Sequence, residues 1–365
     1  MSAAAADEAG FARARMTIDL ARLRQNWQTV RARAVPARCG AVVKHDAYGL
    51  GLEPVTAALA AAGCDLFWTA SLPEALRVRA LAPAADVLAL EGLAGAPPAA
   101  FAAARILPVL AGWNEAVAAA QAGLPVAVMV DGGLCRLGLT DGEMARLAAG
   151  EGLPRRPDIR AFVTQLAHFA DPRSGAAKAQ LARVRAAVAP FGPGIPLSLC
   201  SSAGLFAPPE GGFGEMVRSG SALYGVQTAL PLVHPVDPVV AVDAPVLRVA
   251  GVPAGTPVGY EGATVTQRES RIATLAIGYG DGLPRTLGCG RGHVMVNGRP
   301  APFMGRLSMG LSMVDVTGLA VQPGGRAEIV GPAQSLEALA EAGGTIANAL
   351  MTGLARALPR LWTGG

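Results

Sequence analysis

The chain has 365 residues, enough for two domains with separate buried cores. Its formal net charge of +4 is spread without basic blocks, which argues against nucleic acid as the main partner. The five cysteines are dispersed and form no Cys-x-x-Cys pair, so we expect a reducing, cytoplasmic location and no metal site. Charges and prolines interrupt the apolar runs, which predicts no membrane span. Residues 1–15 lack the apolar core of a signal peptide and are expected to form a disordered lead-in.

The predicted elements begin with a helix after Asp19 that carries Leu20, Leu23, Trp27 and Val30 on one face. Short apolar runs then alternate with alanine-rich helical segments as far as about residue 240. Eight such runs are typical of the parallel strands of a (β/α)8 barrel of the TIM type. The fourth run contains a proline, which makes it the least typical strand. The runs are residues 41–43, 66–70, 87–90, 106–110, 126–131, 159–166, 196–200 and 216–225.

The sequence pattern changes near residue 240. Apolar runs at residues 246–249, 271–277 and 293–298 are separated by glycine and proline turns, and the last one ends in Asn-Gly, a strong hairpin signal. Short helices are expected after Ser335 and Thr345. We therefore predict an α/β protein in which the barrel, residues 16–240, precedes a mainly-β domain, residues 241–365.

The first predicted strand ends at Lys44, and Tyr48 follows in a glycine-rich turn. The chain has 31 lysines and arginines together, yet Lys44 and Lys178 are its two lysines. Arginine stays protonated, whereas lysine can lose its proton and attack a carbonyl group. Sites in such barrels lie at the carboxyl ends of the strands, so Lys44 is the predicted reactive amine. The alternative, a surface lysine, suits Lys178 in its helical segment better.

Further polar residues follow other predicted strands. Taken one at a time, each also has an ordinary structural interpretation: a core histidine, an ion-paired arginine or a helix-capping serine. The four tyrosines each have a glycine neighbour, which is unusual for packing residues, although Tyr224 suits a core role. The candidates are residues 131–136, His168, Ser201, Ser202, Arg218, Tyr48, Tyr260 and Tyr279.

These residues lie in motifs that resemble those of the alanine racemases, a family of pyridoxal-phosphate enzymes of fold type III. The similarity runs through nearly the whole chain after residue 15, and its specificity lies in the order of the motifs. The segments are the cofactor-lysine motif at 41–51, the arginine motif at 131–138, the histidine motif at 167–170, the phosphate and pyridine motifs at 200–203 and 218–225, the tyrosine motifs at 258–260 and 277–285, and the closing segments at 305–309 and from 352 onward.

The resemblance implies a homodimer with shared active sites and a two-base mechanism. Lys44 would hold pyridoxal phosphate and serve the D-face of the amino acid, while Tyr260 of the partner subunit would serve the L-face. Arg218 would face the pyridine nitrogen and keep it unprotonated, where related decarboxylases place a carboxylate. The remaining implied contacts are Tyr48, His168, Ser202, Gly220 and Trp362 for the cofactor, and Arg136, Tyr279 and Met309 for the substrate.

Four positions depart from the family pattern. Met129 stands where many relatives carry a carbamylated lysine, Gly310 where an aspartate is usual and Trp362 in place of a tyrosine, and residues 347–349 replace a more polar segment. These departures leave open a racemase for serine or for several amino acids. A decarboxylase is disfavoured by Arg218, and a non-catalytic pyridoxal-phosphate-binding protein by the second domain. The implied role is supply of D-alanine for peptidoglycan or catabolism of alanine.

Overall fold

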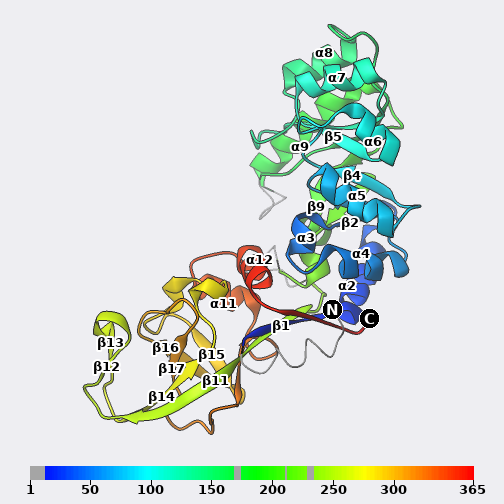
Figure 1. Cartoon of the computed structure of the whole chain (residues 1–365). Helices are drawn as coiled ribbons and strands as arrows, with labels where there is room; N and C mark the ends of the chain where they lie inside the picture. The colour runs from blue at the N-terminus through cyan, green and yellow to red at the C-terminus, as the bar shows by residue number, and fades with distance from the viewer. Residues whose placement is uncertain (1–12, 168–173, 210–211, 228–233) are drawn as a thin grey trace. The chain divides into compact units, whose positions relative to one another are not determined.

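The computed structural model describes residues 13–167, 174–209, 212–227 and 234–365 (Figure 1). These residues form two compact units. The barrel unit comprises residues 22–47 and 51–237, and the β-rich unit comprises the chain up to Ala21, residues 48–50 and residues 238–365. Most of the expected lead-in and His168 lie outside the described residues. Among those described, no helix has both the length and the apolarity needed to cross a bilayer.

Parallel strands form the wall of the barrel unit. From β2 to β8 each strand pairs with its successor, and β10 lies between β2 and β9. Leu199 alone separates β8 from β9 in the chain, so the sheet closes and the predicted (β/α)8 barrel is confirmed. The strands are β2 (Arg38–Val42), β3 (Leu66–Thr69), β4 (Asp86–Ala89), β5 (Leu107–Leu110), β6 (Val126–Met129), β7 (Ile159–Val163), β8 (Leu197–Ser198), β9 (Cys200–Ser201) and β10 (Met216–Ser219).

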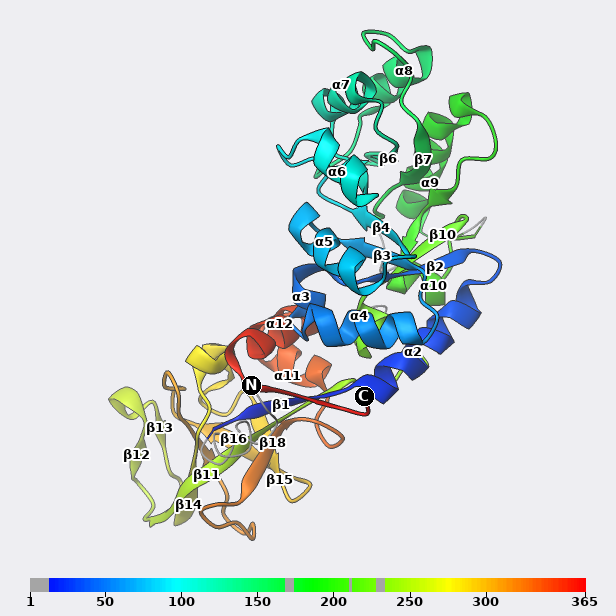
Figure 2. The ribbon, with the colours of Figure 1, turned by 45° about the vertical axis from the view of Figure 1, so that its right-hand side comes forward.

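Helices cover this wall, as with α5 against β3 and β4 (Figure 2). The predicted first helix is α2, and its four apolar residues are buried. Tyr224 is a core residue, and its hydroxyl donates to the Val42 carbonyl at the end of β2 at 2.9 Å. The helices are α2 (Leu20–Ala34), α3 (Lys44–Tyr48), α4 (Leu52–Ala61), α5 (Leu72–Leu81), α6 (Pro98–Ala104), α7 (Trp113–Ala122), α8 (Asp141–Ala149), α9 (Gly175–Val188), η2 (Ala189–Phe191), α10 (Ser202–Phe206) and η3 (Ser221–Tyr224).

The β-rich unit is built on the long strand β11, which pairs with β1 and β18 along its first half and with β14 along its second. The predicted Asn297-Gly298 turn joins β15 to β16, and both residues have positive φ, 49° and 74°. The elements are β1 (Arg15–Asp19), β11 (Val240–Val252), β12 (Pro257–Val258), η4 (Tyr260–Gly262), β13 (Thr264–Val265), β14 (Ser270–Leu275), η5 (Tyr279–Asp281), η6 (Arg285–Leu287), β15 (His293–Val296), β16 (Arg299–Met304), β17 (Ser312–Asp315), β18 (Arg326–Val330), α11 (Leu336–Ala342), α12 (Ala347–Ala357) and β19 (Arg360–Thr363).

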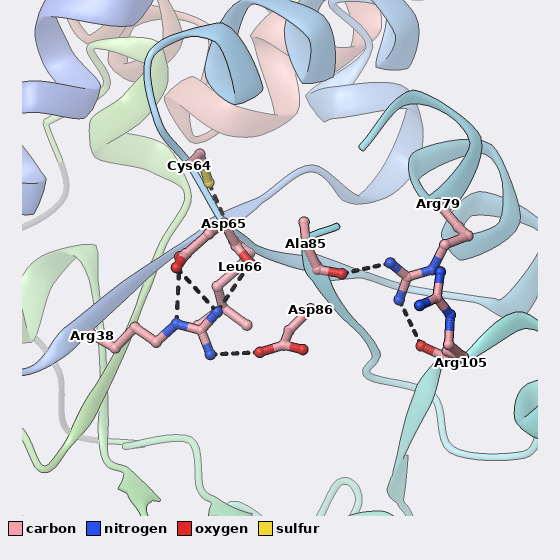
Figure 3. Close-up of polar contacts among 8 residues, drawn as sticks. All are labelled: Arg38, Cys64, Asp65, Leu66, Arg79, Ala85, Asp86 and Arg105. Carbon is pink, nitrogen blue, oxygen red and sulfur yellow. Dashed lines mark hydrogen bonds and ion pairs between the residues drawn. The ribbon is translucent and has the colours of Figure 1, made fainter. Parts of the chain in front are cut away.

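Two arginines tie the amino ends of the first barrel strands together (Figure 3). Arg38, at the start of β2, donates to Asp86 at 2.6 Å and to Asp65 at 3.3 Å. Arg79 of α5 donates to backbone carbonyls, among them that of Ala85 at 2.5 Å and that of Arg105 at 2.6 Å. In barrels of this type the amino-terminal face serves stability, whereas the opposite face carries the site.

Candidate active site

A cavity of about 250 Å³ lies at the carboxyl ends of the barrel strands. Lys44, Arg136 and Arg218 give it three basic side chains, and Glu91 is the one carboxylate among its lining residues in the described part of the chain. Gln165 contributes an amide. The sequence-predicted residues Lys44, Arg136 and Arg218 are thus brought together. The other lining residues are His45, Ala70, Leu90, Met129 and Leu137.

The backbone directly after Lys44 forms a left-handed turn. Residues 45–48 have φ values of 53°, 56°, 54° and 59°, although none is glycine. Each such residue costs about 1–2 kcal/mol, so the turn persists only because its surroundings hold it. The Asp46 carbonyl accepts from the Gly51 N–H, and the Asp46 carboxylate accepts from the Leu52 N–H, both at 2.9 Å. The turn therefore replaces a regular strand-to-helix connection directly after Lys44.

The amine of Lys44 sits in surroundings that favour its neutral form. Burial is the largest influence and lowers the pKa of Lys44, and the positive charges of Arg136 and Arg218 lower it further. The carboxylates of Glu91 and Glu74 act in the opposite direction. Lys44 is consequently deprotonated at a lower pH than an ordinary lysine, as a nucleophilic amine requires.

Arg218 is a buried cation held by neutral oxygens. Its side chain on β10 is 4% exposed, and Nη1 donates to the Ser198 carbonyl at 2.9 Å and to Ser198 Oγ at 2.6 Å. Nη2 donates to the Thr164 carbonyl at 2.5 Å and to Gln165 Oε1 at 3.4 Å. The Trp68 ring lies 5.9 Å away. Burial lowers the pKa of Arg218 to about 10, and within the described residues no carboxylate forms an ion pair with it.

Ser202 connects two of the predicted cofactor-binding segments. The side chain is buried at the start of α10, and its Oγ accepts from the backbone N–H of Gly220 at 3.0 Å and of Ala222 at 3.2 Å. The predicted residues Ser202 and Gly220 therefore meet beside Arg218 on β10, two residues before Gly220 in the chain. Both N–H groups donate to Ser202 Oγ, so the Ser202 hydroxyl proton is the donor that this contact would offer to an anion.

Tyr48 and Trp362, both predicted to bind the cofactor, belong to the β-rich unit. The Trp362 indole N–H donates to the Leu50 carbonyl at 2.8 Å. Arg360, on the same strand β19, donates to the Gly49 carbonyl at 2.6 Å. A Cβ at Gly49, where φ is 87°, would lie 2.9 Å from the Ala355 side chain. Trp362 therefore buttresses the segment that carries Tyr48, and the N–H expected for the cofactor phosphate is engaged by the backbone.

The remaining predicted residues lie on loops of the β-rich unit. Tyr260, Tyr279 and Met309 are 61%, 40% and 66% exposed. The Tyr279 N–H donates to the Ser308 carbonyl at 3.0 Å, and a Cβ at Gly278 would lie 2.2 Å from that same oxygen. The structure thus joins the Tyr279 and Met309 loops through their backbones, and glycine is required where they meet.

Sequence reasoning passed over Gln165, which contacts Arg218 and lines the cavity. We expected His168 at this strand end, but that residue lies outside the described part of the chain. Gln180 of α9 holds the Gln165 segment, because it accepts from the Ala167 N–H at 3.0 Å and donates to the Gln165 carbonyl at 3.2 Å. The available signal was position: Gln165 is the second residue after β7.

The arrangement fits a phosphorylated aldehyde. A neutral amine can bond to the aldehyde carbon, and the arginines supply positive charge for anionic groups. The buried guanidinium of Arg218, which lacks a carboxylate partner among the described residues, would be the donor toward a ring nitrogen. Pyridoxal phosphate has these three features.

The comparisons with known proteins agree with this geometry. Residues 18–228 match the family profile "Alanine racemase, N-terminal domain", and residues 239–362 match "Alanine racemase, C-terminal domain". A catabolic alanine racemase of Rhizobium johnstonii is 40% identical over 349 residues, or 93% of this chain and 92% of that protein. An alanine racemase of Acidiphilium cryptum is 39% identical over 347 residues, or 93% of this chain and 96% of that protein.

A solved structure gives the same answer. The alanine racemase of Bartonella henselae, with covalently bound pyridoxal phosphate, superposes with a TM-score of 0.90 at 33% identity, over 96% of this chain and all of that one. Both halves of the chain, the order of the motifs and the cationic cavity at the barrel mouth are thereby accounted for. The chain belongs to the alanine racemase family of pyridoxal-phosphate-dependent isomerases.

Proposed function

We propose that the chain interconverts L- and D-alanine, with pyridoxal phosphate attached to Lys44 and a second base contributed by Tyr260 of the partner subunit. The observation that carries the proposal is the Lys44 amine, which lines the cavity and whose pKa is lowered by burial and two arginines. Pyridoxal phosphate, when bound, supplies the electron sink that makes the α-proton of an amino acid removable. Lys44 would take or return that proton on the D-face.

Arg218 and Gln165 are proposed to set the electronic character of the site. A fixed guanidinium beside the pyridine nitrogen disfavours protonation of that nitrogen, which weakens the sink and suppresses transamination. Gln165 Oε1 accepts from Arg218 Nη2 at 3.4 Å. Because an amide does not titrate, Gln165 would hold Arg218 without adding a proton-exchanging group. Arg136, also at the cavity, is the proposed substrate-binding cation.

Tyr260 is proposed to act across a dimer interface. Its exposed fraction of 61%, with Tyr279 and Met309 of the same unit also exposed, leaves these three large side chains available to a second copy of the chain. A symmetric homodimer would then hold two sites of mixed parentage. Tyr279 and Met309 are the proposed substrate-binding residues contributed with Tyr260.

The cofactor phosphate is proposed to bind near Ser202 and Gly220, with Tyr48 as a further donor. Buried Ser202 already gathers the backbone N–H groups of this segment, which supports its role there. For Trp362 the same contacts support an indirect role, because its indole N–H holds the backbone at Leu50. We further propose a cytoplasmic enzyme of alanine catabolism, in keeping with the name of the Rhizobium johnstonii relative.

The experiment is to purify the protein, record the visible absorbance of bound cofactor and measure D-alanine formation from L-alanine. Borohydride reduction followed by mass mapping should place the pyridoxyl group on Lys44, and finding it on Lys178 would overturn the assignment. Serine belongs in the substrate panel, because in the described part of the chain, apart from the residues next to Gly310 in sequence, nothing lies within 4 Å of the place where a side chain at Gly310 would begin. A faster reaction with serine than with alanine would replace the proposed substrate.

The shared site has its own test. Lys44→Ala and Tyr260→Ala chains should each be nearly inactive alone. After subunit exchange, hybrid dimers should contain one site with both residues intact, so activity should return to roughly a quarter of wild type for random, symmetric pairing. If exchange is demonstrated and activity stays absent, both bases come from one chain.

A further inference from the structure

Glu74 holds the loop after Lys44 from the side. It lies in the first turn of α5, and its Oε2 accepts from the N–H of Ala70, at the end of the preceding strand, at 2.9 Å. Its Oε1 accepts from the N–H of Asp46 at 3.3 Å. The Glu74 carboxylate thus connects the end of β3 to the left-handed turn that follows β2.

Glu115 makes the same kind of connection elsewhere in the barrel. In the first turn of α7, it accepts from the N–H of Ala111, four residues earlier, at 2.7 Å. It also accepts from the N–H groups of Leu93 at 2.8 Å and Ala94 at 3.1 Å, in the loop between β4 and α6. Glu74 and Glu115 therefore make equivalent contacts with the backbone of neighbouring loops. They differ in the loop that they contact, because the loop bound by Glu74 is the one that follows Lys44.

Asp46 is held from both sides by α5. While its N–H donates to Glu74, its carboxylate receives Arg77, one turn further along α5, at 3.3 Å. Arg77 in turn donates to Glu53, in the first turn of α4, at 2.7 Å. Because the turn is strained at four consecutive residues, these contacts select the left-handed conformation over a relaxed one.

We propose that Glu74 is a positioning residue, which fixes the left-handed turn and thereby directs the amine of Lys44 into the cavity. The inference rests on the proposed role of Lys44 in the reaction. Without the Glu74 acceptor, the Asp46 N–H loses its partner and the turn relaxes toward right-handed backbone, which moves Lys44 away from Arg136 and Arg218.

The test compares Glu74→Ala and Glu74→Gln with the matched control Glu115→Ala, all in the full chain. The first readout is pyridoxal phosphate affinity, titrated by absorbance. The second is acetylation of Lys44 by acetic anhydride as a function of pH in cofactor-free protein, quantified by mass spectrometry. Lys178, the other lysine, is exposed on α9 and serves as the internal reference in every sample.

Glu74→Ala should weaken cofactor affinity at least tenfold, while Glu115→Ala should stay within twofold of wild type. In Glu74→Ala the pH of half-maximal Lys44 acetylation should rise, because the amine leaves the burial and the arginines that lower its pKa. In Glu74→Gln it should fall. The amide oxygen can still accept from the Asp46 N–H, although the bond from Ala70 is lost, and the negative charge that favours the protonated amine is removed.

A fall in both Glu74 variants would show that Glu74 acts through its charge alone, and an unchanged midpoint would show that it has no effect on Lys44; either result overturns the proposal. An equal loss of affinity in Glu115→Ala would assign the effect to general weakening of the barrel. The acetylation profile needs no cofactor, so a shifted profile together with borohydride labelling at another residue would reject Lys44 as the cofactor lysine and leave the positioning role intact.

Discussion

Replacing Arg218 with methionine removes a buried cation while filling much of the same space. Burial lowers the pKa of Arg218 to about 10, well below that of an ordinary arginine, so the folded protein disfavours the charged form by roughly 3 kcal/mol at 1.36 kcal/mol per pKa unit. Both pKa values lie above neutrality, so Arg218 is charged in the folded and the unfolded chain at pH 7. The cost is therefore constant through the neutral range and is relieved only as the pH rises above about 10.

Two of the oxygen atoms that lose their hydrogen bond to Arg218 in the variant keep another hydrogen bond. The Ser198 carbonyl keeps the Thr164 N–H at 3.0 Å, and Ser198 Oγ keeps its bond to the Met216 carbonyl at 2.9 Å. The Thr164 carbonyl loses the guanidinium, at a cost of about 1–3 kcal/mol for an unmet buried acceptor. Relief and loss nearly cancel, so we expect the free energy of unfolding of cofactor-free Arg218→Met to lie within about 2 kcal/mol of wild type.

The assay is urea unfolding followed by far-ultraviolet circular dichroism, after cofactor removal, because bound cofactor stabilises the folded state by mass action. Phe67→Ala, which truncates a fully buried ring, should lose about 3–5 kcal/mol and shows that the assay responds. Cofactor affinity of Arg218→Met should fall sharply despite its near-normal stability. A loss above about 4 kcal/mol would refute the reasoning and make Arg218 a structural residue of the core.

Three further outcomes are expected. His45→Gly should raise the free energy of unfolding by about 0.5–1 kcal/mol, since the exposed His45 has φ of 53° and glycine removes that strain at some entropic cost; equal or lower stability would contradict the strain. In urea unfolding, Arg79→Met should lower the free energy of unfolding by roughly 2 kcal/mol or more, because Arg79 donates to four backbone carbonyls. Arg38→Met should lower it by under about 1 kcal/mol, because the aspartate partners of Arg38 are mostly exposed. A larger loss in Arg38→Met than in Arg79→Met would contradict this. The pKa of Lys44 in the folded chain lies below its ordinary value of 10.5, so the unfolded chain binds more protons between these two pH values. The free energy of unfolding of cofactor-free wild type should therefore increase with pH in that window, relative to Lys44→Met. A difference between the two proteins that does not change with pH would contradict the lowered pKa.

Much of the fold follows from local sequence pattern. Each of the eight apolar runs overlaps a barrel strand, because burial on both faces demands continuous apolar residues. The bounds differ: β2 begins at Arg38, before its run, and the seventh run divides into β8 and β9. The last run was wrong in its second half, where Ser221–Tyr224 forms the 3-10 helix η3. The Asn297-Gly298 turn was predictable, since both residues tolerate positive φ. β1 was not predicted as a strand, because its pairing partners β11 and β19 lie far away in the chain.

Some residues of the candidate site could be predicted from the sequence, whereas others are recognised only from tertiary contacts. The sequence alone predicts Lys44 as the reactive amine and Arg218 as its companion, because one is a rare residue type at a strand end and both lie in ordered motifs. Tertiary structure decided that Gln165 contacts Arg218 and that Trp362 supports the backbone at Leu50, because each contact joins residues far apart in the chain.

The left-handed turn after Lys44 is the feature that local sequence predicts least well. No local preference predicts positive φ at four consecutive residues other than glycine, and each of them would avoid it in isolation. Glu74 and Arg77, on a different helix, hold Asp46 in that conformation. The lowered pKa of Lys44 likewise arises from burial and from arginines on other segments. The proposed reactive group could therefore be predicted from the sequence, whereas the direction of its side chain and its lowered pKa arise only when distant segments pack together.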